Sequence, residues 1–145
     1  MNEYLKERNL WYPVSAELMA SYCDGSHSEK RPDGTLEWVK NGQLHRDLDK
    51  PAYIGAKGLA WYKNGKKQRD DNKPVVIWHD GTVEWWTNGL RGRLNGPSVI
   101  FPRGHCEWVI NGKWITDDVK KWLKVRQYTY PFTPEQQVEF ALTFS

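Results

Sequence analysis

The chain has few of the residues that mark secreted, membrane-embedded or disulfide-stabilised proteins. It contains two cysteines in 145 residues, Cys23 and Cys106, and no Cys-x-x-Cys pair, which is too little for a disulfide framework. No apolar run approaches the roughly 20 residues that a membrane-spanning helix needs. The first ten residues mix both charges and lack the apolar core of a secretory signal. We therefore expect a cytoplasmic protein that does not enter a membrane.

The familiar motifs of catalytic and metal sites are also missing. There is no Gly-rich phosphate loop, no Gly-x-Ser-x-Gly turn and no His-Glu-x-x-His helix. The four histidines are scattered, and the nearest candidate for a metal site or a nucleophile pair is His105 beside Cys106. Strand alternation would point these two side chains to opposite faces. We therefore expect no catalytic residues, no metal and no cofactor.

What the chain has instead is tryptophan, nine in all, and a repeat. The segment Trp-x-x-Asn-Gly occurs four times, with its tryptophans 23, 24 and 23 residues apart. The repeated positions are Trp38, Asn41 and Gly42, then Trp61, Asn64 and Gly65, then Trp85, Asn88 and Gly89, then Trp108, Asn111 and Gly112. An arginine (Arg46, Arg69, Arg93), a proline (Pro51, Pro74, Pro97) and a glycine (Gly58, Gly81, Gly104) follow the first three in near-constant phase. Landmarks kept in phase in this way indicate a repeat architecture.

The chemistry of the repeat predicts β-hairpins. Asn-Gly suits a two-residue type I′ turn, because both central residues need positive φ. The run before each turn alternates with period two, and a second strand follows each proline, where a missing N–H is tolerated. We expect a mainly β protein: an elongated antiparallel β-meander of about three and a half 23-residue repeats over residues 34–116. Residues 1–33 would form an N-terminal cap and residues 117–145 a C-terminal helical cap, giving an α+β chain with one structural domain.

Two C-terminal segments have the pattern of helices. Residues 116–126 carry acids in the first turn and an apolar stripe, with Thr116 as the expected N-cap. Residues 133–142 begin with Thr133 as N-cap and Pro134 at the first helical position. Residues 14–22 are compatible with a short N-terminal helix. These segments would seal the ends of the stack, and the terminal helices could also cover one sheet face.

On these residues the chain resembles the variant class of MORN repeats, in the form Trp-x-x-Asn-Gly-x-x-His-Arg-x-x-Gly-Pro-Ala. The first unit matches the pattern best, at Trp38, Asn41, Gly42, His45, Arg46, Pro51 and Ala52. The first two units carry one extra residue before proline. The resemblance covers about residues 34–116. It implies a binding or scaffolding module, and it suggests a bacteriophage or large DNA virus as the source.

The tryptophan ladder, Trp38, Trp61, Trp85 and Trp108, has two interpretations. We favour a spine of core residues that stack from repeat to repeat over an exposed platform for nucleotide bases. Strand alternation sends the next residue in each unit to the other face, together with Tyr53, Val76 and Val99; these next residues are Val39, Tyr62, Trp86 and Val109. That second apolar face would be covered by a partner, a second copy or the N-terminal segment.

Basic residues form the other candidate contact set. Residues 34–116 hold 13 Lys and Arg against 8 Asp and Glu, and the basic residues singled out are Arg46, Arg69, Arg93, Lys66 and Lys67. They would bind an acidic ligand, although the acids beside them favour Arg–Asp pairing between adjacent repeats. The candidate partner-binding residues are thus Tyr62, Trp86, Val39 and these five basic residues.

The leading functional hypothesis is a non-enzymatic protein-binding module, encoded by a phage, that inhibits or modulates a host defence protein in the host cytosol. One alternative is an oligomeric sponge that holds a nucleotide or oligonucleotide between aromatic faces and arginines. Another is a small hydrolase, for which Glu37, Glu84 and Glu107 align across repeats, although the repeat geometry explains that alignment without catalysis. A homo-oligomer is compatible with the exposed sheet face.

Overall fold

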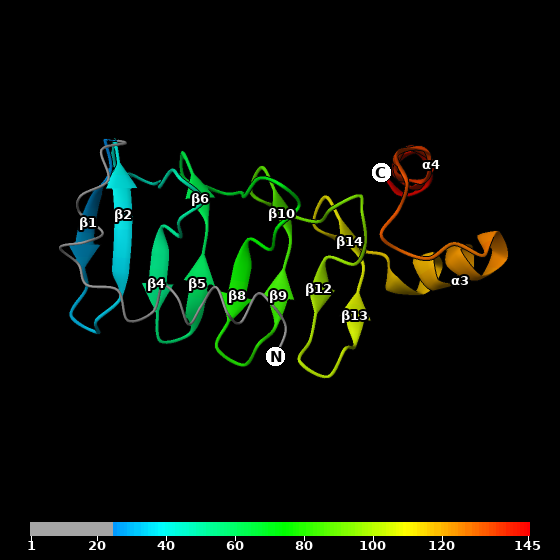
Figure 1. The fold of residues 1–145 in the computed structure, drawn as a ribbon, viewed down its shortest axis with the longest axis horizontal. Coiled ribbons are helices and arrows are strands. Elements are labelled where there is room, and N and C mark those ends of the chain that lie inside the picture. The colour runs from blue at the N-terminus through cyan, green and yellow to red at the C-terminus, as the bar shows by residue number, and fades with distance from the viewer. Residues whose placement is uncertain (1–24) are drawn as a thin grey trace.

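The computed structural model describes residues 25–145 and shows a long antiparallel sheet that ends in two helices (Figure 1). The main sheet has nine strands within this range, in the order β1-β2-β4-β5-β8-β9-β12-β13, with β3 paired to β2. The strands are β1 (His27–Lys30), β2 (Leu36–Lys40), β3 (Gln43–Leu44), β4 (Tyr53–Gly55), β5 (Gly58–Ala60), β6 (Tyr62–Lys63), β7 (Lys66–Lys67), β8 (Val76–Trp78), β9 (Val83–Glu84), β10 (Trp86–Thr87), β11 (Leu90–Arg91), β12 (Val99–Ile100), β13 (Cys106–Glu107), β14 (Val109–Ile110) and β15 (Lys113–Trp114). The helices are α3 (Thr116–Arg126) and α4 (Pro134–Phe144). The expected β-meander with C-terminal helices is confirmed.

The Asn-Gly turns form as their chemistry predicts. In the four turns the asparagine φ lies between 49° and 52° and the glycine φ between 75° and 83°, which are the positive values that a type I′ turn requires. These turns therefore set the phase of the repeat.

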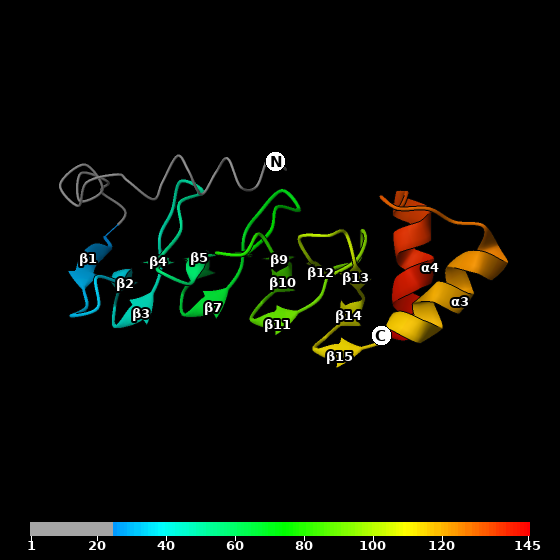
Figure 2. The same cartoon turned by 90° about the horizontal axis from the view of Figure 1, so that it is seen from below.

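The course of the chain differs from the expected single ribbon at three of the ladder tryptophans, Trp61, Trp85 and Trp108. The backbone N–H of Trp61 donates to the carbonyl of Val75 on the main sheet, whereas its carbonyl accepts from Gln68 in the Asn-Gly hairpin. Trp38 and Trp85 divide their backbone bonds in the same way. The hairpins β6-β7, β10-β11 and β14-β15, which follow Trp61, Trp85 and Trp108, form separate two-stranded sheets, whereas Trp38 lies within β2 and its hairpin β2-β3 stays in the main sheet. Figure 2 shows strands β7, β11 and β15 displaced to one side of the main sheet, in a row with β3.

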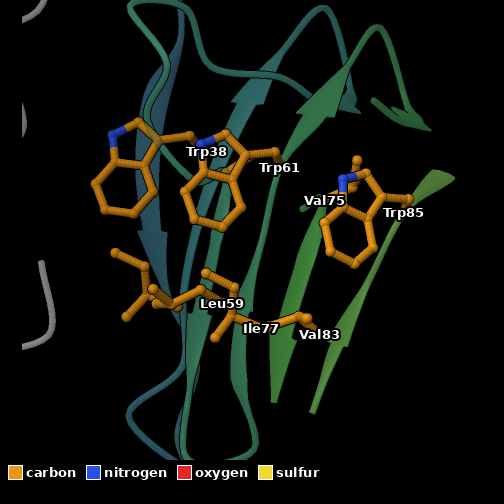
Figure 3. Packing of buried hydrophobic residues seen from close by; sticks show 9 residues of the cluster. Trp38, Leu59, Trp61, Val75, Ile77, Val83 and Trp85 are labelled. Carbon is orange, nitrogen blue, oxygen red and sulfur yellow. The ribbon is translucent and has the colours of Figure 1, made fainter. Parts of the chain in front are cut away.

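Strand pairing places two rows of side chains on the two faces of the main sheet. The row that shares its side with the ladder, here called the tryptophan face, consists of Leu36, Ile54, Leu59, Ile77, Val83, Ile100 and Cys106. The opposite row, here called the glutamate face, consists of Glu37, Tyr53, Ala60, Val76, Glu84, Val99 and Glu107. The core lies on the tryptophan face, where Trp38, Trp61 and Trp85 are at most 3% exposed (Figure 3). The ladder is therefore a spine of core residues.

The two helices seal the C-terminal end of the stack and do not cover a sheet face (Figure 1). Trp108 packs there against Phe132 and Phe140, with ring centroids 5.7 Å apart in both pairs. The fourth ladder tryptophan has no further repeat beyond it, so aromatic side chains of the helical end take that place. Neither helix is long and apolar enough to cross a bilayer, nor is any other helix within residues 25–145.

The helix starts agree with the sequence in one case only. Thr133 accepts a hydrogen bond from the N–H of Gln136, whose side chain accepts in return from the N–H of Thr133, a complete capping box. Thr116 is not an N-cap, because helix α3 begins at Thr116 itself and Ile115 holds the N-cap position. The hydroxyl of Thr116 instead donates to Glu107. The possible helix at residues 14–22 lies outside the described residues.

Candidate partner-binding site

Two of the three phase-locked arginines, Arg46 and Arg69, lie inside the fold. Arg46 is 2% exposed and Arg69 is 9% exposed. Each arginine stacks on the tryptophan of its own unit, with its guanidinium carbon 4.0, 3.7 and 3.6 Å from the rings of Trp38, Trp61 and Trp85 respectively. Their first role is therefore to hold the spine, and Arg46 and Arg69 cannot offer their charge to a partner at the surface.

The second unit shows how neighbouring repeats are joined. Arg69 donates to both carboxylate oxygens of Asp49, at 2.6 and 3.1 Å, and to the carbonyl of Pro74 at 3.0 Å. The indole N–H of Trp61 donates to the carbonyl of Asp49 at 3.1 Å. Lys73 adds a contact of 2.7 Å to the same carboxylate. The expected Arg–Asp pairing between adjacent repeats is thus present, and we call this set the Asp49 junction.

The extra residue before proline in the first two units has a structural use. It lets two consecutive residues take left-handed conformations, Leu48 and Asp49 in one loop and Asp71 and Asn72 in the next, with φ between 52° and 62°. The carbonyl of Asn72 then accepts from the indole N–H of Trp85 at 2.9 Å, as that of Asp49 does from Trp61. Asparagine and aspartate, which tolerate this conformation better than most residues, hold three of the four positions. The longer loops connect repeats because they bring the carbonyls of Asp49 and Asn72 to the tryptophan of the next unit.

A cavity, here called the central hollow, opens on the glutamate face. Its volume is about 190 Å³, and it lies between the main sheet and the hairpin β6-β7. The lining residues come from both parts: Tyr53, Lys57, Gly58, Leu59, Ala60, Tyr62, Lys67, Val76 and Trp78. Sheet and hairpin residues meet here because the chain bends at Trp61.

A second feature runs along the hairpins, where basic and aromatic side chains alternate. The Lys67 ammonium lies 4.1 Å from the ring of Trp86, and Arg91 lies 5.0 Å from Trp86 and 5.5 Å from Trp114. These distances are within the range of cation–π contacts. We call Lys67, Trp86, Arg91 and Trp114 the cation–π row. It joins three successive hairpins, and Trp114 at its end is 54% exposed.

Glu84 fixes the orientation of the rings around the row. This carboxylate is 6% exposed and accepts from the indole N–H of Trp78 at 2.9 Å and from that of Trp86 at 2.8 Å. Arg91 contacts it at 3.3 Å. Burial lowers the pKa of Lys67, and the charge of Glu84 offsets only part of this effect. The site is thus a set of aromatic side chains held by hydrogen bonds, with two partly buried cations, Lys67 and Arg91.

The structure brings together three of the predicted partner-binding residues: Tyr62, Trp86 and Lys67. Val39 is half-buried in β2, and Lys66 is exposed with its stem against Gly89. Arg93 is partly exposed and stacks on Trp85.

Sequence reasoning missed four further residues of the site, Lys57, Trp78, Arg91 and Trp114. Arg91 and Trp114 each stand two residues after the glycine of an Asn-Gly turn, and that shared phase was a signal that could have found them.

His105 and Cys106 do not form a joint site. His105 contacts Glu107 at 2.7 Å, whereas the Cys106 sulfur lies 3.8 Å from the hydroxyl of Tyr130. Within residues 25–145 no group of three His, Cys, Asp or Glu side chains is placed to hold a metal ion.

No family model, curated protein or solved structure matches the chain. The resemblance to MORN-repeat variants therefore remains a prediction from the motif.

Proposed function

We propose that this chain is a non-enzymatic protein-binding module whose contact surface is the cation–π row together with the central hollow. The row is the observation that carries the proposal. It presents tryptophan and arginine, two of the residues most enriched at interface hot spots, and it fixes them before any partner arrives. Less conformational entropy is then lost on binding than with mobile side chains.

The remainder of the repeat supports this choice of surface. The tryptophan ladder and the buried arginines are engaged in the core. The row, in contrast, lies on the hairpins, and its last member is more than half exposed. A regular scaffold that buries its repeated residues and varies the others is well suited to recognition.

The resemblance to MORN-repeat variants supports a narrower form of the proposal. In that form the chain is phage-encoded and acts in the host cytosol, where it inhibits or modulates a host defence protein.

The test is a quantitative pull-down from bacterial lysate with wild-type chain, Trp114→Ala and Leu48→Ala. Leu48 is 68% exposed and lies in a loop outside the row, so it is a matched control for loss of exposed apolar surface. We expect at least one captured protein whose recovery falls about ten-fold or more with Trp114→Ala and is unchanged with Leu48→Ala. If every captured protein responds equally to the two variants, the row is not the contact surface.

A further inference from the structure

The central hollow lies where the repeat departs from its own pattern. The residue immediately before the ladder tryptophan is a glutamate in three units, Glu37, Glu84 and Glu107, and alanine in the second unit. Strand pairing places Ala60 in the same row of the glutamate face as those three residues. The structural role of the repeat therefore does not explain the alanine.

In the other units the glutamate at the equivalent position of the sheet is paired. Glu37 contacts Arg31 at 2.6 Å, Glu84 accepts from two indole N–H groups, and Glu107 accepts from the hydroxyl of Thr116. At Ala60 a single methyl group stands in that place, and the hollow opens above it. The central hollow thus coincides with the one unit that lacks the glutamate, although shallower and more polar hollows also lie beside Glu37 and Glu107.

The walls of the hollow are aromatic. Tyr62 borders it from the hairpin, Trp78 from β8 and Tyr53 from β4. Tyr53 lies along its own strand, because position 55 is glycine: a Cβ there would come within 2.7 Å of the Tyr53 hydroxyl. Glu84 holds the Trp78 indole from outside the hollow. Rings held in this way form a preformed slot for a flat apolar group.

The two charged residues that line the hollow are both basic, and the carboxylate of Glu84, outside the lining, also acts on Lys67. Lys57 and Lys67 both line it, and none of its nine lining residues, all within the described range, carries a carboxylate. Burial disfavours the charged form of Lys67 and lowers its pKa. A negative group beside the hollow would restore the missing solvation of that ammonium.

We propose that the central hollow is an anchor pocket for one aromatic side chain of the partner, carried in an acidic segment. This inference rests on the proposed function and names the chemistry that the surface recognises. Complete small-molecule sites are about 300–1,000 Å³, and the hollow, at about 190 Å³, is the size of one side chain. A single aromatic anchor in a pocket is a common form of hot spot.

The test uses a synthetic pentapeptide, acetyl-Glu-Glu-Phe-Glu-Glu-amide, titrated into ¹⁵N-labelled chain. We expect shifts of the backbone amides of Gly58, Ala60 and Val76, and no such shifts with the matched peptide in which alanine replaces phenylalanine. Adenosine monophosphate is titrated in parallel. If it shifts the same amides at lower concentration than the peptide, or if the peptide shifts none of them, the proposal is overturned.

The decisive variant is Ala60→Glu, which fills the hollow with the residue that three other units carry at this position. The fold is therefore expected to tolerate it, and the dispersion of its amide spectrum verifies that. We expect the peptide to bind about thirty-fold more weakly, as for loss of a hot-spot anchor. Unchanged affinity in a folded Ala60→Glu variant would overturn the proposal.

Lys67→Gln separates charge from shape. This variant should weaken binding of the glutamate peptide several-fold and leave unchanged the affinity for a peptide with glutamine in place of glutamate. Equal weakening for both peptides would overturn the assignment of an acidic segment. The pull-down distinguishes failure of the two proposals: a protein lost with Trp114→Ala but retained with Ala60→Glu would disprove the anchor pocket and leave the binding function in place.

Discussion

Replacing Arg69 with methionine is expected to destabilise the fold substantially, because Arg69 links two repeats. The change keeps the length of the side chain and most of its apolar contact. It removes the stack on Trp61 and the hydrogen bonds to Asp49 and Pro74. The Arg69 side chain is only 3% exposed, so water cannot replace these contacts.

The magnitude follows from the separate contributions. Charge-assisted hydrogen bonds are worth about 1.5–3 kcal/mol, and an unpaired buried carbonyl, here that of Pro74, costs about 1–3 kcal/mol. A desolvated cation–π contact adds about 2 kcal/mol. The lost desolvation penalty of the guanidinium acts in the opposite direction. Asp49 also keeps Lys73 and is 42% exposed, which limits the damage. We expect a net loss of about 3 kcal/mol, or a Tm lower by about 10 °C for a chain of this size.

The assay is thermal and urea denaturation followed by tryptophan fluorescence. Arg31→Met is the matched control, since Arg31 also pairs with a carboxylate, Glu37, but its side chain is 56% exposed. Exposed ion pairs contribute little to stability, so this variant should unfold almost as the wild type does. If both methionine variants unfold at the same temperature, the Asp49 junction does not hold the repeats together.

Two further predictions concern the same scaffold. Gly58→Ala should lower Tm more than Gly34→Ala. Both glycines have positive φ, but only at Gly58 would the new Cβ meet backbone, 2.2 Å from the carbonyl oxygen of Ile77. Equal Tm losses in calorimetry would contradict this steric account. The pKa of Asp49 lies below its usual value, since burial would raise it but hydrogen bonds from Arg69 and Lys73 outweigh that effect. A carboxyl with a lowered folded pKa stabilises above its unfolded pKa of about 3.9, and this stabilisation is lost as the pH falls through the folded pKa. Asp49→Asn should therefore cost stability at pH 7 and much less near pH 2, and urea denaturation that gave the same difference at both pH values would disprove the linkage.

The local elements could be predicted from the sequence because their causes are local. Asn41 and Gly42 are among the few residues that accept positive φ at adjacent positions, so the turn is determined wherever the pair occurs. Thr133 followed by Pro134 specifies a helix start in the same way. Thr116 is not an N-cap, because its hydroxyl oxygen accepts from the backbone N–H of Trp108 while its O–H donates to Glu107. Nothing in the local sequence indicates these contacts.

The candidate site was only partly predictable. Alternation placed Tyr62 and Trp86 on the correct side of the strand, because the period of a strand is two. It did not show that Arg46 and Arg69 turn inward, since a charged residue is usually exposed. The stack on tryptophan and the hydrogen bonds to proline carbonyls make the burial of both favourable, and neither can be read from alternation.

By itself the sequence determined the repeat, its turns, the apolar spine and the helices that follow, because each of these depends on residues close together in the chain. Only the tertiary structure decided where the hairpins leave the main sheet and which side chains meet across repeats. Trp61 directs its N–H toward the sheet and its carbonyl toward the hairpin, and that division of hydrogen bonds brings Ala60, Tyr62 and Lys67 around one hollow. Such a cavity arises from the packing of separate strands, so no single segment of the chain contains it.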